Sequence, residues 1–328
     1  MRVLVTGSAG HLGDALVRVL RADGLDVVGL DLLDSASTDV VGSIGDRAFV
    51  RDTIAGADAV LHAATLHKPH VGSHSRQQFV DTNVSGTLTL LEEAVAAGVS
   101  RFVFTSTTSA FGRALVPPPG APATWIDEDV APRPRNIYGA TKVAAEDLCE
   151  LIHRDHGLPV LVLRTSRFFP EEDDRDEVRV AYPAANAKVN ELLYRRADLQ
   201  DVVDVHRLAL ARAPAIGFGR YIVSATTPFT RADLAQLRSD APAIVARRFP
   251  AYSELYERLG WSMFGQIERV YDNARARHDL GWTPRWDFGH ALERLAAGEE
   301  PFSELTAVVG VKGYHAAPTG VYTTRGRG

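Results

Sequence analysis

The sequence is poor in cysteine and has no long apolar run. Cys149 is the single cysteine, which excludes an internal disulfide framework and favours a reducing compartment. No run of about 18 apolar residues occurs, so no membrane-spanning helix is expected. The first residues, MRVLVTG, predict a strand rather than a secretion signal. We therefore expect a cytoplasmic protein that makes no use of a membrane.

Basic residues are also too scattered to form a stripe of positive charge. The chain has 36 basic and 41 acidic residues and a formal net charge of -5. Proteins that follow a phosphate backbone cluster their basic residues, so a nucleic acid is not expected as a partner. Hydrophobic residues make up 45% of the chain, an ordinary share for a globular enzyme.

Short β-branched runs alternate with helical patterns through the first half of the chain. Each run is followed by a segment whose apolar residues are three and four positions apart. Strands that are apolar almost throughout belong in a parallel sheet covered by helices on both faces. We predict an α/β fold with a Rossmann-type doubly wound parallel sheet and a smaller C-terminal substrate-binding lobe. The predicted strands are RVLVT, DVVGL, DAVLHA, RFVFTS and PVLVLR.

The second half of the chain has a looser pattern. We expect residues 1–166 to form mainly the dinucleotide-binding domain, 167–313 mainly the substrate lobe, with some strands and helices returning to the sheet, and 314–328 a tail with little to pack against. The proline-rich segment 113–134 is expected to be a surface loop beside the carboxyl ends of the strands. For the acidic stretch 171–177 we expect a solvated loop, with a binding role as the alternative.

A glycine-rich turn joins the first strand to the first helix. The segment TGSAGHLG places Gly7, Gly10 and Gly13 at the three positions of a G-x-x-G-x-x-G turn. The first glycine permits a tight turn, the second lets the backbone approach a pyrophosphate, and the third lets the helix pack close to the strand. These glycines and Leu12 are therefore predicted to contact a dinucleotide.

An acidic residue at the end of the second strand indicates which dinucleotide binds. Asp31 lies about twenty residues past the turn, where a carboxylate accepts hydrogen bonds from the adenosine ribose. The following LLDSAST has no basic residue to neutralise a ribose phosphate, so NAD is favoured over NADP. Asp46, Ala63 and Ala64 are further candidates for contacts with the adenosine part of the cofactor.

Tyr138 and Lys142 are four residues apart at the start of an amphipathic helix, so they leave the same face. An ammonium group near a phenol favours the phenolate, and we expect it to lower the pKa of Tyr138 so that the phenol serves as a general base. Lys142 is also a candidate to hold the nicotinamide ribose. Thr107, at the end of the fifth strand, is placed to align a substrate oxygen. Asn83 is expected near the cofactor, where its amide would brace the active-site helix or a water chain.

These motifs together resemble the extended short-chain dehydrogenase/reductase family, whose best-known members are NAD-dependent nucleotide-sugar epimerases and dehydratases. The resemblance implies that Tyr138 is the acid/base, Lys142 its partner and Thr107 the hydroxyl residue. It also implies a homodimer formed by helices near residues 76–98 and 137–156. The segments that carry the resemblance are TGSAGHLG, NVSGT, FTSTTSAFG, YGATK and DNARARHDLGWTPRWDF.

Two departures from the family pattern bear on the substrate. Dehydratases of this family carry an Asp-Glu pair directly after the threonine, where this chain has Thr108 and Ser109, so dehydration is disfavoured. Arg167 lies near the position where epimerases carry an asparagine. It is expected either to clamp an anionic group or to pair with the acidic stretch.

Other residues are weaker candidates for substrate contacts. Arg196 is near the expected nucleotide diphosphate, and His67 and Thr108 are expected at the nicotinamide end. His67, His70 and His74 lie close together in sequence, but we expect no metal because nothing else in the sequence supports a ligand geometry.

Three functions remain open from the sequence. The first is an NAD-dependent enzyme that oxidises and reduces a secondary alcohol of a sugar or nucleotide sugar, most simply as an epimerase. The second is an NAD-dependent dehydrogenase of a polyol or carbonyl compound without a nucleotide. The third, a non-catalytic dinucleotide-binding protein, is disfavoured because both Tyr138 and Lys142 are present.

Overall fold

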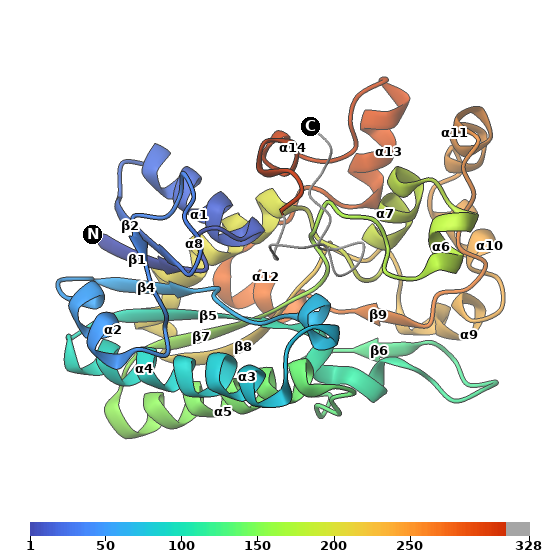
Figure 1. The fold of residues 1–328 in the computed structure, drawn as a ribbon. Coiled ribbons are helices and arrows are strands. Elements are labelled where there is room, and N and C mark those ends of the chain that lie inside the picture. The colour runs from blue at the N-terminus through green and yellow to red at the C-terminus, as the bar shows by residue number, and fades with distance from the viewer. Residues whose placement is uncertain (313–328) are drawn as a thin grey trace.

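The computed structural model describes residues 1–312, and its centre is a seven-stranded sheet (Figure 1). All the strand pairs in this sheet are parallel. The strand order, β3-β2-β1-β4-β5-β7-β8, reverses its direction between β1 and β4. Sheets of this kind bind ligands at such a switch point, and the predicted doubly wound fold is confirmed. The strands are β1 Arg2–Thr6, β2 Asp26–Asp31, β3 Val40–Val41, β4 Ala59–His62, β5 Arg101–Thr107, β7 Val160–Thr165 and β8 Phe218–Val223.

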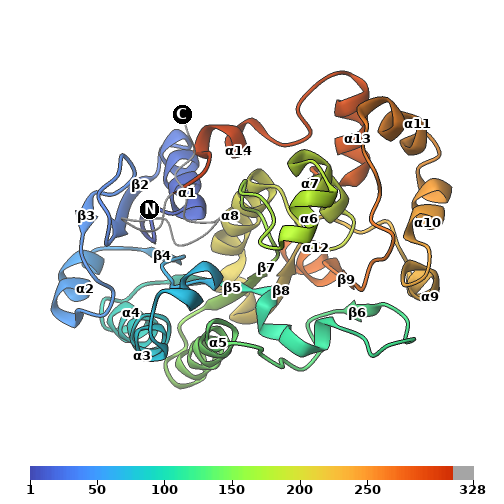
Figure 2. The ribbon, with the colours of Figure 1, turned by 45° about the vertical axis from the view of Figure 1, so that its right-hand side comes forward.

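Helices cover both faces of the sheet because successive residues of a strand point to opposite sides. In β1, Val3 and Val5 pack in one hydrophobic cluster with α1 and α8, whereas Leu4 packs in another with α2, α4 and α5. Figures 1 and 2 show these two sets of helices on opposite sides of the sheet. The helices are α1 His11–Ala22, α8 Leu199–Ile216, α2 Arg47–Ile54, α4 Gly86–Ala96 and α5 Ile137–His156; α12 Ala274–Leu280 and α14 Glu304–Val309 join the side of α8.

A third hydrophobic cluster lies beyond the carboxyl ends of the strands, on the right of Figure 1. Its fully buried members include Val189, Leu192, Val245 and Phe288. Most of its residues come from short helices in the second half of the chain. These helices are α6 Asp176–Ala181, α7 Ala184–Leu192, α9 Leu234–Leu237, α10 Ala241–Arg248, α11 Tyr252–Leu259 and α13 Phe288–Ala296.

The segment 113–134 is more ordered than the predicted surface loop. It begins inside the helical turns η3, Thr108–Leu115, and it contains strand β6, Thr124–Ile126. Strand β6 pairs in parallel with β9, Arg269–Tyr271, as a separate two-stranded sheet. Ile126 and Tyr271 are buried together in a small cluster. A three-residue strand whose partner lies so far along the chain gives no periodic signal, so the sequence did not predict it.

Four short helical segments complete the described part of the chain. No helix within residues 1–312 is long and apolar enough to cross a membrane. The predicted tail at 314–328 lies outside the described residues. The short segments are η1 Lys68–Gly72, α3 Arg76–Val80, the π-helix η2 Asp81–Ser85 and η4 Arg231–Asp233.

Candidate active site

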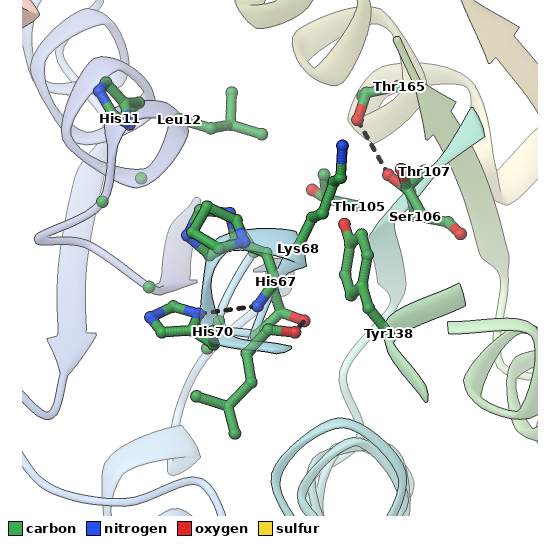
Figure 3. A pocket seen from close by; sticks show the side chains of 18 of the residues that line it. His11, Leu12, His67, Lys68, His70, Thr105, Ser106, Thr107, Tyr138 and Thr165 are labelled. Atoms are coloured by element: carbon green, nitrogen blue, oxygen red, sulfur yellow. Dashed lines mark hydrogen bonds between the residues drawn. The ribbon is translucent and has the colours of Figure 1, made fainter. Parts of the chain in front are cut away.

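A cavity of about 450 Å³ opens at the carboxyl ends of β1, β4 and β5. Its wall comes from segments that are distant in sequence. They are the glycine turn after β1, the end of β2, the loops after β4 and β7, the first turn of α5, and β9. Figure 3 shows a close view of this cavity. The cavity therefore lies at the carboxyl ends of the strands, where a ligand site is predicted.

The glycine turn has the backbone conformation that a pyrophosphate site needs. Gly7 has a φ of 77°, and a Cβ at this position would lie 2.7 Å from the backbone nitrogen of Ala64. A Cβ on Gly13 would lie 1.9 Å from the carbonyl oxygen of Gly7, so only glycine lets α1 start this close to the turn. Helix α1 has no side-chain cap at Gly10. Its first N–H groups are thus available to an anion, and the turn fits a dinucleotide phosphate.

Asp31, the last residue of β2, lies in the cavity wall, and backbone N–H groups bind its carboxylate. One of its carboxylate oxygens accepts a hydrogen bond from the backbone N–H of Ala9 at 3.0 Å, and the other accepts one from that of Leu33 at 3.0 Å. Burial raises the pKa of Asp31, and these backbone bonds act in the opposite direction. Asp31 lines the cavity together with Ala63 and Ala64. The structure therefore places these three residues in one cavity wall, and their contact with the adenosine part of a cofactor stays a prediction.

Asp46 has a different position from the one expected. It caps α2 by accepting hydrogen bonds from the backbone N–H groups of Ala48 and Phe49, at 3.1 and 3.2 Å. It does not line the cavity, whose wall here is formed by Ser43 and Ile44. An Asp that precedes a helix is a strong capping residue, and this local role accounts for it.

Tyr138 is buried in the first turn of α5 and lines the cavity. Figure 3 shows its phenol pointing from α5 into the pocket that the end of β5 also lines. Burial raises the pKa of Tyr138 to about 12, and a hydrogen bond with the Thr107 side chain acts in the opposite direction. The pKa decrease predicted from the sequence is wrong for the chain alone. The phenol is protonated at neutral pH and is able to donate its proton.

The position of Lys142 explains why the pKa of Tyr138 is not lowered, because the ammonium group of Lys142 does not face the cavity. Its Nζ donates a hydrogen bond to the backbone carbonyl of Thr105 at 2.6 Å and lies 4.0 Å from the centre of the Phe104 ring. Burial lowers the pKa of Lys142 to about 7, and the charge of Glu146 acts in the opposite direction. Lys142 thus ties α5 to β5 behind the pocket wall.

Asn83 braces the pocket from behind its wall. Its side-chain oxygen accepts a hydrogen bond from the backbone N–H of Leu66 at 2.8 Å. Its amide nitrogen donates to the Leu66 carbonyl at 2.8 Å and to the Thr141 hydroxyl at 3.0 Å. Asn83 does not line the cavity, whereas Leu66 does. It therefore joins the loop after β4 to α5, one of the two bracing roles expected from the sequence, and makes no direct contact with the cavity.

The expected arginines are held in a buried ion-pair network. Arg167 pairs with Asp173 at 2.9 Å, and Arg195 pairs with both Asp173, at 2.8 Å, and Glu191. Arg196 pairs with Glu191 at 2.8 Å. Although burial raises the pKa of Glu191, the charges of Arg195, Arg196 and Arg167 hold it well below its usual range. Arg167 and Arg195 line the cavity, but Arg196 lies behind it.

The acidic stretch 171–177 contributes directly to this network, which corrects the solvated loop expected from the sequence. The side chains of Glu171 and Asp173 are buried. Glu171 lies 2.8 Å from the His11 ring nitrogen, so the stretch also touches the glycine turn. Charge runs usually face water. This one is partly buried because arginine and histidine side chains surround it.

Three histidines enter the pocket wall from the loop after β4. Figure 3 shows the Nδ1 atom of His70 accepting a hydrogen bond from the backbone N–H of His67, at 2.9 Å. The His67 ring lies 5.6 Å from that of Phe169. Within residues 1–312, no group of three His, Cys, Asp or Glu side chains could hold a metal ion. All three histidines and Thr108 line the cavity, and the predicted substrate contacts of His67 and Thr108 remain candidates.

Several residues of the cavity wall were not predicted from the sequence. Phe168 and Phe169 come from the loop after β7, and Arg269 and Tyr271 come from β9. Strand β9 immediately precedes the segment DNARARHDLGW, which resembles the family's closing pattern. The alternating positions of Arg269 and Tyr271 on this strand place them on the same side, which an extended run before that segment could have indicated.

The chain is similar to proteins of one known family. The model of the NAD dependent epimerase/dehydratase family matches residues 3–215. The chain is 30% identical to a dTDP-glucose 4,6-dehydratase of Streptomyces antibioticus, over 90% of this chain and 91% of the relative. It is 31% identical to a UDP-glucose 4-epimerase of Mycolicibacterium smegmatis, over 87% and 94%. A short-chain dehydrogenase/reductase superfamily protein from Agrobacterium tumefaciens, solved with bound NAD, is 26% identical and superimposes with a TM-score of 0.66, over 90% of this chain and 96% of that chain.

Proposed function

Because the chain belongs to the NAD-dependent epimerase/dehydratase family, we propose that it oxidises and re-reduces a secondary alcohol of a sugar or nucleotide sugar, as an epimerase does. The observation that carries this proposal is the buried phenol of Tyr138 in the wall of the cavity, with the Thr107 hydroxyl as a hydrogen-bonding partner. The family is NAD-dependent, and NAD supplies a site that accepts a hydride and returns it.

The residues present fit this cofactor. Because glycine has no side chain, the backbone of the glycine turn can come close to a pyrophosphate. Gly7, Gly10, Leu12 and Gly13 lie in the cavity wall. We assign the adenosine ribose to Asp31 because a carboxylate accepts hydrogen bonds from two hydroxyls. The small side chains of Ala63 and Ala64, in the cavity wall beside β4, leave room for the dinucleotide.

The proton transfer is assigned to Tyr138. With a pKa of about 12 the phenol is protonated, and it donates its proton to the substrate oxygen when a carbonyl is reduced. Oxidation of the alcohol requires the phenolate, which the positive charge of a bound nicotinamide ring would favour. The phenolate takes the proton of the alcohol and thereby becomes the phenol that donates it in the reduction. Thr107 holds the same substrate oxygen in position, and Lys142 supports the geometry by fixing α5 on β5.

The cavity disfavours water elimination. Among the described residues that line it, Asp31 is the one carboxylate, and it lies at the adenosine end. Thr108 and Ser109 occupy the wall where an acid and a base would be needed. An elimination requires a proton acceptor at one carbon and a donor at the leaving hydroxyl. Oxidation followed by re-reduction needs no proton acceptor or donor other than Tyr138.

Replacing Tyr138 tests the proposal. We expect Tyr138→Phe to lower turnover about 10²- to 10⁴-fold and to leave NAD affinity unchanged, because the lost hydroxyl acts on the substrate. Tyr252→Phe is a matched control, since its hydroxyl bonds to the Pro242 carbonyl in α10, outside the pocket wall. Unchanged turnover in Tyr138→Phe would refute the assignment. Free NADH accumulating beyond the bound cofactor would identify a net dehydrogenase and exclude the epimerase.

A further inference from the structure

The cationic residues at the substrate end of the cavity differ in whether they already have a partner. Arg167 and Arg195 line the cavity, yet both are paired with buried carboxylates of this chain. Lys68, at the rim, is paired with Asp174. Removing a buried charge from its partner is strongly unfavourable. These cations are therefore poorly placed to receive a new anion.

Every carboxylate in this network is shared by more than one cation. The guanidinium groups of Arg167, Arg195 and Arg196 face the carboxylates of Asp173, Asp174 and Glu191. Arg175 also pairs with Asp173, and Lys68 with Asp174. A diphosphate entering here would meet buried carboxylates that repel it as well as arginines that attract it. A nucleoside diphosphate would have to compete with these carboxylates for arginines that are already paired.

Arg269 is different from the other cations in the wall. It lies on β9 and lines the cavity, and within residues 1–312 it forms no ion pair. Its Nε is buried and has no hydrogen-bond partner there; the same is true of the Nε of Arg195, but Arg195 is already paired with two carboxylates. A buried guanidinium atom without a partner carries a desolvation cost that an acidic ligand would remove.

Two aromatic rings hold the Arg269 guanidinium in place. Its central carbon lies 5.7 Å from the centre of the Tyr194 ring and 5.9 Å from that of Tyr271. These contacts are within the range of cation–π attraction, which positions a guanidinium without neutralising it. The guanidinium of Arg269 is therefore held in place without a carboxylate partner among residues 1–312. It can bind one carboxylate or phosphate through two hydrogen bonds.

We propose that the substrate is a sugar carrying a single acidic group, a carboxylate or a phosphate monoester, which Arg269 binds, and that it is not a nucleoside diphosphate sugar. This inference rests on the proposed function, because it names the substrate class of the same site. Carboxylate and phosphate both present a pair of anionic oxygens that can accept two parallel hydrogen bonds from a guanidinium. The chemistry of the acidic group is left to experiment.

Calorimetry on the NAD-saturated protein tests the proposal with five ligands: glucose, glucuronate, glucose 6-phosphate, UDP and UDP-glucose. We expect one of the two acids to bind at least tenfold more tightly than glucose, and UDP-glucose to bind no more tightly than glucose. The preferred acid identifies the group as carboxylate or phosphate. Tighter binding of UDP or UDP-glucose than of both acids, or no binding of either acid at millimolar concentration, would overturn the proposal.

Variants connect the affinity to Arg269. Arg269→Gln should weaken binding of the preferred acid about 10- to 100-fold, the usual value of a charged hydrogen bond, and leave NAD affinity unchanged. Arg269→Lys should retain part of the affinity because it keeps the charge. Arg258→Gln, an exposed arginine of α11 outside the cavity wall, is the matched control and should behave as the original protein. An acid affinity within twofold of the original in Arg269→Gln would refute the assignment.

The two proposals fail in different ways. If the acid binds through Arg269 but Tyr138→Phe keeps its turnover, the proposed chemistry is wrong and the assignment of the acidic group stands. If turnover depends on Tyr138 but UDP-glucose is the better ligand, the chemistry stands and the inference about Arg269 is wrong.

Discussion

The buried ammonium group of Lys142 should make the stability of the protein depend on pH in a defined window. Burial lowers the pKa of Lys142 from 10.5 to about 7, with the charges of Glu146 and Cys149 acting in the opposite direction. The unfolded chain keeps this lysine protonated up to about pH 10.5, so between the two values the unfolded state binds more protons than the folded state. Stability must therefore rise with pH from 7 upward.

The size of the effect follows from the two pKa values. Proton linkage for a single group with these values gives an increase in the free energy of unfolding of about 2 kcal/mol between pH 7 and pH 9. Below pH 7 the lysine is protonated in both states, and the full cost of burying its charge applies. Lys142→Met keeps the apolar stem and removes the titration, so its stability should lack this slope.

Urea denaturation of both proteins at several pH values, without added dinucleotide, measures the difference. The charge of Lys142 also acts on the buried His62. Burial, with this charge, lowers the pKa of His62 to about 3, so His62 does not titrate in this window in the folded state. The difference in slope between the two proteins isolates Lys142 from groups common to both. Equal slopes from pH 7 to pH 9 would show that the ammonium is solvated, and would refute the buried position behind the pocket wall.

Two further predictions concern a buried carboxylate and the glycine turn. Burial raises the pKa of Asp201 to about 7, so the folded state binds more protons than the unfolded state between about pH 4 and 7. The free energy of unfolding should fall by about 2 kcal/mol from pH 5 to pH 7, and a flat profile is expected for Asp201→Asn; the same slope in both proteins would contradict the assignment. Gly13→Ala should weaken NAD binding about 10- to 100-fold in a fluorescence titration, because its Cβ would meet the Gly7 carbonyl oxygen at 1.9 Å. Gly265→Ala, with no atom within 4 Å of the added Cβ, is its control, and equal affinities would show that the turn adapts.

Local patterns predicted the sheet and the position of the cofactor turn. Each of the five predicted strand runs corresponds to a strand of the sheet, because apolar β-branched runs bounded by turns are a short-range signal. The glycine spacing of the turn is equally local, and both the family and the use of NAD are confirmed. Tyr138 was found in the same way, from a spacing of four residues on one helix.

Features that depend on long-range packing were not predictable from local patterns. The ammonium of Lys142 bonds to the Thr105 carbonyl of β5, and no spacing along α5 indicates this choice. The acidic stretch is partly buried because Arg195 and His11 come to it from distant parts of the chain. Arg269 lies in the pocket wall only because β9 pairs with β6.

The pairing of β6 with β9 has a consequence for how the protein folds. The two strands are separated in sequence by β7, α8 and β8, so closing this contact carries the entropy cost of a very long loop. On the ribosome, the glycine turn and the first sheet strands emerge early and can associate before β9 has been synthesised. The dinucleotide end of the pocket is thus expected to form first. The wall that carries Arg269 and Tyr271 can close only in a late, slow step of folding.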